Sequence, residues 1–173
     1  MPLLDRKGLR DDFYVRAADG EVSPVSHLIV PWIDLPEALS RRGRDQRIGV
    51  EVPNTVKASE LRLVQRQLSL VAIRFPAFSD GRGFSLARQL RNNGFSGVIR
   101  AVGPLIADQF AYALACGFDE IDLPEAVAAR QPVEQWLAAL GSITRTYQRG
   151  YGDAGNILDQ RRAARLAASK EAG

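Results

Sequence analysis

A short polar loop carries the residues best suited to hold an anion. Asp80 and Arg82 flank Gly81, between an apolar run that ends at Phe75 and a helical pattern that begins at about Phe84. Glycine permits tight backbone geometry, and the free N–H groups at a helix start favour a negative charge. An arginine can also grip a carboxylate, sulfate or phosphate through two hydrogen bonds. The loop therefore predicts a site for an anion.

The next unit of the chain supplies further polar groups in a similar position. A strand predicted at 97–100 ends in Arg100, and the following helical segment carries Asp108 and Gln109. Because ligands bind beyond the carboxyl ends of parallel strands, we expect these groups to converge near one mouth. The ligand-binding candidates are Asp80, Gly81, Arg82, Ser85, Arg100, Asp108 and Gln109. In the alternative interpretation the loop is only a turn and helix cap, and the arginines are surface ion pairs of little energetic weight.

Regular elements must position these residues. Apolar runs predict strands at 48–52, 70–73, 97–100 and 119–123, and spacing predicts helices at 59–68 (capped by Ser59), 84–93, 105–115 and 132–147. Strands that alternate with helices of this length indicate βα units and a parallel sheet. A full (β/α)₈ barrel needs about 250 residues, and the chain has 173. We therefore expect a partial (β/α) barrel or a small open doubly wound sheet.

The two ends of the chain differ from this regular body. Residues 1–25 are expected to be irregular or a hairpin, with a short strand at 13–15 and a turn at 18–20. An apolar run at 27–30 and a short helix to Arg41 follow. We expect one α/β domain over 1–149, and a glycine-rich linker with a basic C-terminal helix or tail over 150–173. Residues 145–173 hold six basic and three acidic residues, so the rest of the chain is balanced at 17 of each.

Composition excludes several kinds of chemistry. The chain has one His and one Cys, so a Cys/His zinc cluster cannot form, and a Ser-His-Asp or Cys-His pair would have to use His27. We expect no metal and no cofactor, and no catalytic residue is assigned. His27 is expected to be structural, Cys116 a packed thiol, and Trp136 part of the core or of an oligomer surface. Without a membrane-length apolar run, a signal-like start or a basic body, we expect a cytoplasmic protein that binds neither membrane nor nucleic acid.

The stretch 73–123 closely resembles a bacterial family known as domain of unknown function 934. Its first block corresponds to Phe75, Pro76, Phe78, Asp80, Gly81, Arg82, Ser85, Ala87, Leu90 and Arg91. Its later blocks correspond to Ile99, Arg100, Ala101, Gly103, Asp108, Gln109, Cys116, Gly117, Phe118 and Asp119. Ile99 replaces the usual Leu, and Ala115 stands where an Arg often precedes the Cys. The resemblance implies a gene beside assimilatory sulfite reductase, and some members are labelled oxidoreductases of sulfite reduction.

Three hypotheses follow. The first is an accessory protein of sulfite reduction that binds the reductase, its electron donor or a sulfur oxyanion at the Asp80–Arg82 mouth. The second is an oxidoreductase that borrows an electron carrier. The third is a non-catalytic assembly module that binds a partner through the Trp136–Tyr147 helix. A homodimer is expected, because an incomplete sheet or barrel leaves edges to cover.

Overall fold

The computed structural model describes residues 2–17 and 25–140. Its strands form one eight-stranded sheet in the order β2-β1-β8-β7-β6-β5-β4-β3. The six strands from β3 to β8 run parallel in chain order, and the hairpin β1–β2 adds an antiparallel edge beside β8. The strands are β1 (Leu3–Asp5), β2 (Gly8–Arg10), β3 (Val15–Arg16), β4 (His27–Pro31), β5 (Arg47–Pro53), β6 (Leu70–Arg74), β7 (Val98–Val102) and β8 (Glu120–Asp122).

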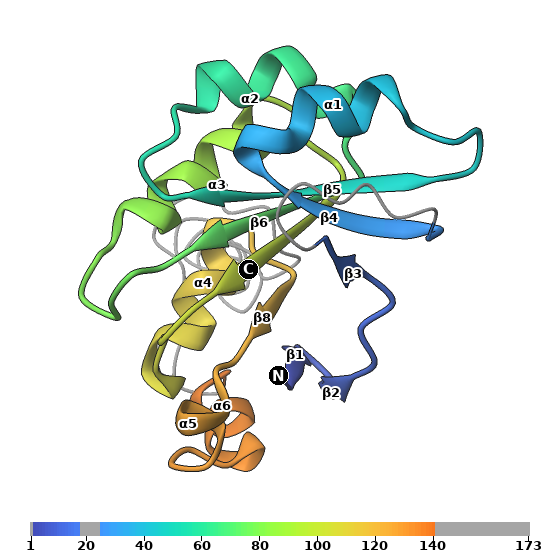
Figure 1. Cartoon of the computed structure of the whole chain (residues 1–173). Helices are drawn as coiled ribbons and strands as arrows, with labels where there is room; N and C mark the ends of the chain where they lie inside the picture. The colour runs from blue at the N-terminus through green and yellow to red at the C-terminus, as the bar shows by residue number, and fades with distance from the viewer. Residues whose placement is uncertain (1, 18–24, 141–173) are drawn as a thin grey trace, which may run out of the picture.

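Helices follow most of the parallel strands. They are α1 (Leu35–Ser40), α2 (Ala58–Val64), α3 (Arg82–Asn92), α4 (Phe110–Cys116), α5 (Glu125–Ala128) and α6 (Val133–Leu140), with 3₁₀ turns η1 (Trp32–Asp34), η2 (Gln65–Gln67) and η3 (Ala107–Gln109). Figure 1 shows α1, α2 and α3 along one side of the sheet and the blue N-terminal edge strands β1–β3 away from these helices. A strand order that never reverses is that of a partial (β/α) barrel rather than a doubly wound sheet.

Chain connectivity explains why the sheet curls. The two edge strands, β2 and β3, are joined by only four residues, 11–14. Eight strands laid flat would place these edges about 34 Å apart, whereas the connection spans at most about 17 Å. The sheet must therefore curl into a half-barrel, with residues 11–16 lying across its concave side. We call residues 11–16 the strap.

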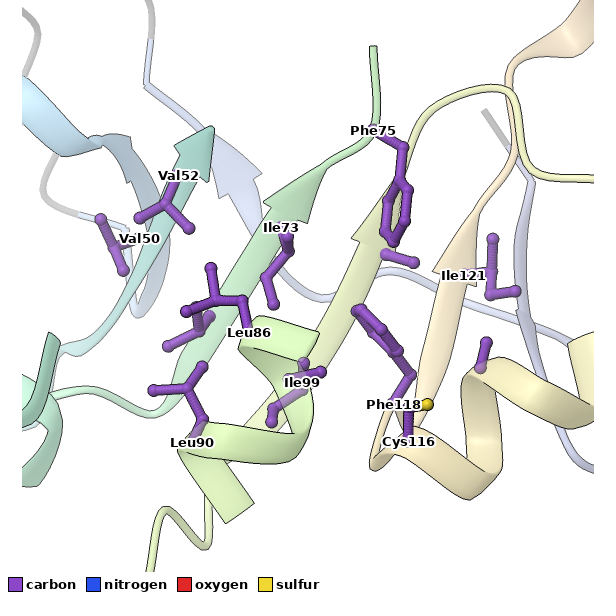
Figure 2. Close-up of a cluster of buried hydrophobic side chains, with 14 of the residues drawn as sticks. Val50, Val52, Ile73, Phe75, Leu86, Leu90, Ile99, Cys116, Phe118 and Ile121 are labelled. Atoms are coloured by element: carbon purple, nitrogen blue, oxygen red, sulfur yellow. The ribbon is translucent and has the colours of Figure 1, made fainter. Parts of the chain in front are cut away.

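Strand alternation separates an apolar outer face from a polar inner face. Figure 2 shows the outer core, where side chains of β5–β8 meet Leu86 and Leu90 of α3. Phe75 packs there against the rings of Phe84 and Phe118. The alternate positions of the same strands face the concave side, where a small apolar cluster of Ile29, Leu70, Ala72 and Val102 gives way to charged residues.

Several predicted boundaries were wrong. β7 runs to Val102, so Arg100 lies in the middle of its strand and not at the end. α3 begins at Arg82 rather than Phe84, because Gly81 is its N-cap. Ser59 does not cap α2, which starts one residue earlier after Lys57. The turn at 18–20, the end of the helix predicted to 147 and the segment 150–173 lie outside the described residues.

No helix in the described ranges has the length and apolar character to cross a membrane.

Candidate functional site

The loop between β6 and α3 holds an ion pair on the molecular surface. Arg82 Nε donates to Asp80 Oδ1 at 2.9 Å, and Arg82 Nη2 donates to Asp80 Oδ2 at 2.6 Å. The backbone N–H of Arg82 also donates to Asp80 Oδ1 at 3.2 Å. The hydrogen bonds from Arg82 hold the pKa of Asp80 well below its usual range, and the carboxylate raises the pKa of Arg82. The pair is thus a preoriented, charge-neutral unit, and the Arg82 side chain is 61% exposed.

Gln109 joins this loop to the next βα unit. Its Nε2 donates to the carbonyl of Phe78 at 2.8 Å, while its Oε1 accepts from the N–H of Ile106 at 3.2 Å. Two of the predicted site regions are therefore clamped together at the carboxyl edge of the sheet. Two further candidates are exposed: Asp108 lies in the turn η3, and Ser85 lies on α3.

Glycine packing fixes where the loop sits. A Cβ on Gly83 would overlap the ring of Phe75, and a Cβ on Gly103 would overlap the Phe75 carbonyl oxygen. Gly103 also has φ +129°, in the region that favours glycine. These two glycines let α3 and the loop after β7 approach Phe75 closely, which positions the Asp80–Arg82 pair above the end of β6.

Arg100 does not lie with this pair. Its side chain is 1% exposed on the concave face, where Nη1 and Nη2 donate to the two Asp12 oxygens at 2.6 and 2.8 Å. Nε donates to Glu120 Oε1 at 2.8 Å. Burial alone would lower the pKa of Arg100, but the hydrogen bond to Asp12 and the charge of Glu120 raise it. Arg100 therefore fastens the strap to the sheet.

A second group of charges lies on the same concave face, closer to the carboxyl ends of the strands. Arg16 bridges Glu51 of β5 and Asp122 of β8, and Arg74 of β6 pairs with Glu51. We call Arg16, Glu51, Arg74 and Asp122 the inner cluster. The predicted site residues include none of these four, although Arg74 is the last residue of β6 and so lies at the carboxyl end of its strand.

Another residue of the motif, Arg91, joins neighbouring elements of the fold. Arg91 donates to the carbonyls of Phe95, Gly97 and Gly117 at 2.7–2.9 Å and pairs with Asp119. Together these contacts tie α3 to the start of β7 and to the turn before β8, away from the carboxyl edge.

The thiol of Cys116 lies in the core, as Figure 2 shows. Arg88 Nη2 lies 4.0 Å from the sulfur. A hydrogen bond with Cys116 raises the pKa of Tyr112. His27 packs edge-on against Tyr14, and Trp136 is fully buried against Phe110.

A curled sheet of parallel βα units with polar groups gathered at its carboxyl edge defines the chain as a partial (β/α) barrel. Comparison with family models then places it: the chain belongs to the family described as bacterial protein of unknown function, DUF934, whose model matches residues 49–157. The match includes the Asp80–Arg82 loop and Arg100 and excludes the strap. A comparison with curated proteins finds no significant match.

Proposed function

We propose that this chain is an accessory protein of assimilatory sulfur metabolism that assists sulfite reduction by binding the reductase through the loop at 76–82. The metabolic setting rests on the resemblance to a family whose genes stand beside sulfite reductase. The assignment of the binding site to this loop rests on the position of the loop and on the chemistry of its side chains. The electron donor of the reductase and a sulfur oxyanion are the alternative ligands that the experiment must separate.

The Asp80–Arg82 pair, in which the side chain of Arg82 is 61% exposed and that of Asp80 is 17% exposed, is the observation that carries this proposal. Asp80 occupies the Nε and Nη2 edge of Arg82, and its charge balances that of the guanidinium. A free sulfur oxyanion would have to compete with this carboxylate, so the pair favours a partner surface that complements both charges. Phe78 stands in the same loop and is 54% exposed. Arginine and aromatic side chains are enriched where protein interfaces make their strongest contacts.

Binding measurements on purified proteins test the proposal. The chain is immobilised and titrated with sulfite reductase and, separately, with the electron donor of the reductase, while isothermal titration with sulfite and sulfate measures anion binding. We expect the reductase to bind, and we expect Arg82→Ala and Phe78→Ala each to weaken it about tenfold or more, as truncation of an interface anchor does. Arg62→Ala, an exposed arginine on α2, is the matched control and should bind normally.

Each other outcome has a defined meaning. If only the electron donor binds, the donor rather than the reductase is the partner of this loop. Sulfite binding that Arg82→Ala abolishes supports an anion site. Consumption of reduced nicotinamide with sulfite by the purified chain supports the oxidoreductase alternative. Failure to bind the reductase, the donor and both anions rejects the proposed function.

A further inference from the structure

Three parallel strands end in charged residues that meet on the concave face. Arg16 is the last residue of β3, Arg74 the last of β6 and Asp122 the last of β8. Glu51 joins them from β5, two residues before that strand ends. In barrels built from βα units, ligands bind at the carboxyl ends of the strands. The inner cluster thus occupies the position where this architecture places its sites.

Among the residues that the structure describes, one buried oxygen of this cluster lacks a partner. Ile121 of β8 points into the outer core, so its neighbour Asp122 points to the concave side, where Arg16 engages Oδ2. The Asp122 side chain is 3% exposed, and within the described part of the chain its Oδ1 accepts no hydrogen bond. A buried carboxylate oxygen without a donor costs about 1–3 kcal/mol. Oδ1 therefore requires a donor group.

The same cluster presents hydrogen-bond donors that are not used. Arg16 uses Nε and Nη2, and Arg74 uses Nη2, so among the described residues the Nη1 groups of both remain open. The Arg74 side chain is 60% exposed, while Glu51 is 14% exposed with both oxygens engaged by these arginines. Two guanidinium groups and two carboxylates make the cluster neutral overall. It offers an acceptor at one point and donors at another.

We propose that the inner cluster binds a small zwitterion of the amino-acid class. The ammonium group of the ligand donates to Asp122 Oδ1, and its carboxylate accepts from the open edges of Arg74 and Arg16. A ligand without net charge suits a neutral cluster, since a lone anion or cation would leave either Oδ1 or the guanidinium edges without a partner. The residues of this site lie on the concave face and include none of the loop at 76–82, so the proposal does not depend on the proposed docking function.

Thermal unfolding of the full chain with each standard amino acid at millimolar concentration tests the proposal. We expect at least one of them to raise Tm, and isothermal titration to confirm stoichiometric binding of that amino acid. Acetate and ethylamine, which carry only one of the two charged groups, should each give a smaller shift than the amino acid. If acetate alone raised Tm by as much as the amino acid, the ligand would be a simple anion rather than a zwitterion, and the proposal would be wrong. The absence of any shift would also overturn it.

Two variants assign the binding to the inner cluster. Arg74→Gln replaces an exposed guanidinium group with a neutral amide and should leave the fold intact. It should weaken binding about tenfold, the loss expected for one charged hydrogen bond. Asp122→Asn removes the charge that faces the ammonium group and should abolish binding, with far-ultraviolet circular dichroism to check folding. Arg62→Gln on α2 is the control. If the amino acid binds Arg74→Gln as tightly as it binds the natural chain, the site lies elsewhere and the proposal fails.

Discussion

Gly103 lies in a tightly packed position at the carboxyl edge of the sheet. It follows β7 directly, adopts φ +129° and lies against the backbone of Phe75, the residue that leads into the Asp80–Arg82 loop. Positive φ alone strains any other residue, and the close approach adds a backbone clash that a side-chain rotation cannot relieve.

We therefore predict that Gly103→Ala destabilises the fold by about 2 kcal/mol or more. Gly94→Ala is the matched control: Gly94 also has positive φ, at +82°, but a Cβ there would meet open space, so its cost should be about 1 kcal/mol. Urea unfolding of both variants measures the difference. Equal costs would show that the approach to Phe75 is not tight.

Asp12 gives the strap a dependence on pH. Burial alone would raise the pKa of Asp12, but the hydrogen bonds from the Arg100 guanidinium and the Tyr14 N–H outweigh it, and the pKa lies below its ordinary value. The unfolded chain then binds more protons than the folded one in acid. The stabilising contribution is thus complete above the ordinary pKa of about 4 and is lost as pH falls through the lower folded value.

We predict that Asp12→Asn flattens this acid limb of the stability curve. The free energy of unfolding of the natural chain should fall more steeply below about pH 4 than that of the variant, as measured by urea unfolding at a series of pH values. Asp11→Asn, an exposed neighbour in the strap, is the control and should follow the natural chain. Parallel curves for the Asp12→Asn variant and the natural chain would mean that the Asp12–Arg100 pair does not stabilise the strap.

At the scale of elements, Arg91 organises the amino-terminal end of the half-barrel. Its side chain is 16% exposed and donates to three carbonyl groups, those of Phe95 and Gly97 in the loop before β7 and that of Gly117 after α4. Gly117, at φ +107°, ends α4 beneath it, and a Cβ on Gly117 would lie 2.6 Å from Arg91 Cγ. The arginine and the glycine therefore form one packing unit between α3 and α4.

We predict that Arg91→Ala costs about 2–4 kcal/mol of stability, because several partly buried carbonyls lose a charged donor together. Arg88→Ala, one turn earlier on α3, removes a donor to the single carbonyl of Ala115 and should cost less than about 1 kcal/mol. Thermal or urea unfolding compares the two. A small effect of Arg91→Ala would mean that water satisfies these carbonyls equally well.

The local pattern predicted most of these elements. Apolar runs located β5, β6, β7 and β8, and helical spacing located α3 and α4, since each buries one regular face. What failed was the end of β7. Ala101 and Val102 read as a loop after a charged residue, yet they continue the strand because Arg100 is neutralised on the concave side by Asp12 and Glu120. That pairing joins residues 88 positions apart, for which local sequence holds no signal.

In the candidate site, too, local sequence predicts one part and misses another. The loop with Asp80 and Arg82, and its link to Gln109, could be predicted because all three lie at strand-to-helix connections. The inner cluster could not, because Arg16 reaches Asp122 across 106 positions of the chain from a two-residue strand that carries little pattern of its own.

At the scale of the whole molecule, the strap turns its polar residues inward and its apolar residues outward. Asp12, Tyr14 and Arg16 contact the sheet, whereas Phe13 and Val15 are 67% and 48% exposed. A strand that packs on an apolar core has the reverse arrangement, with its apolar side chains inward and its polar side chains outward. It arises because the concave face is lined with charges, and ion pairs rather than apolar burial hold the open side of the half-barrel closed.

We propose that this chain meets its partner at the carboxyl edge of the half-barrel, through the loop at 76–82. Hydrogen exchange of the chain with and without sulfite reductase tests this most directly, because it maps the contact without altering a residue. We expect slower exchange of the amide groups at 77–82 in the complex, with the β1–β2 hairpin unchanged. Protection confined to other segments, or exchange that is identical in both samples, would contradict it.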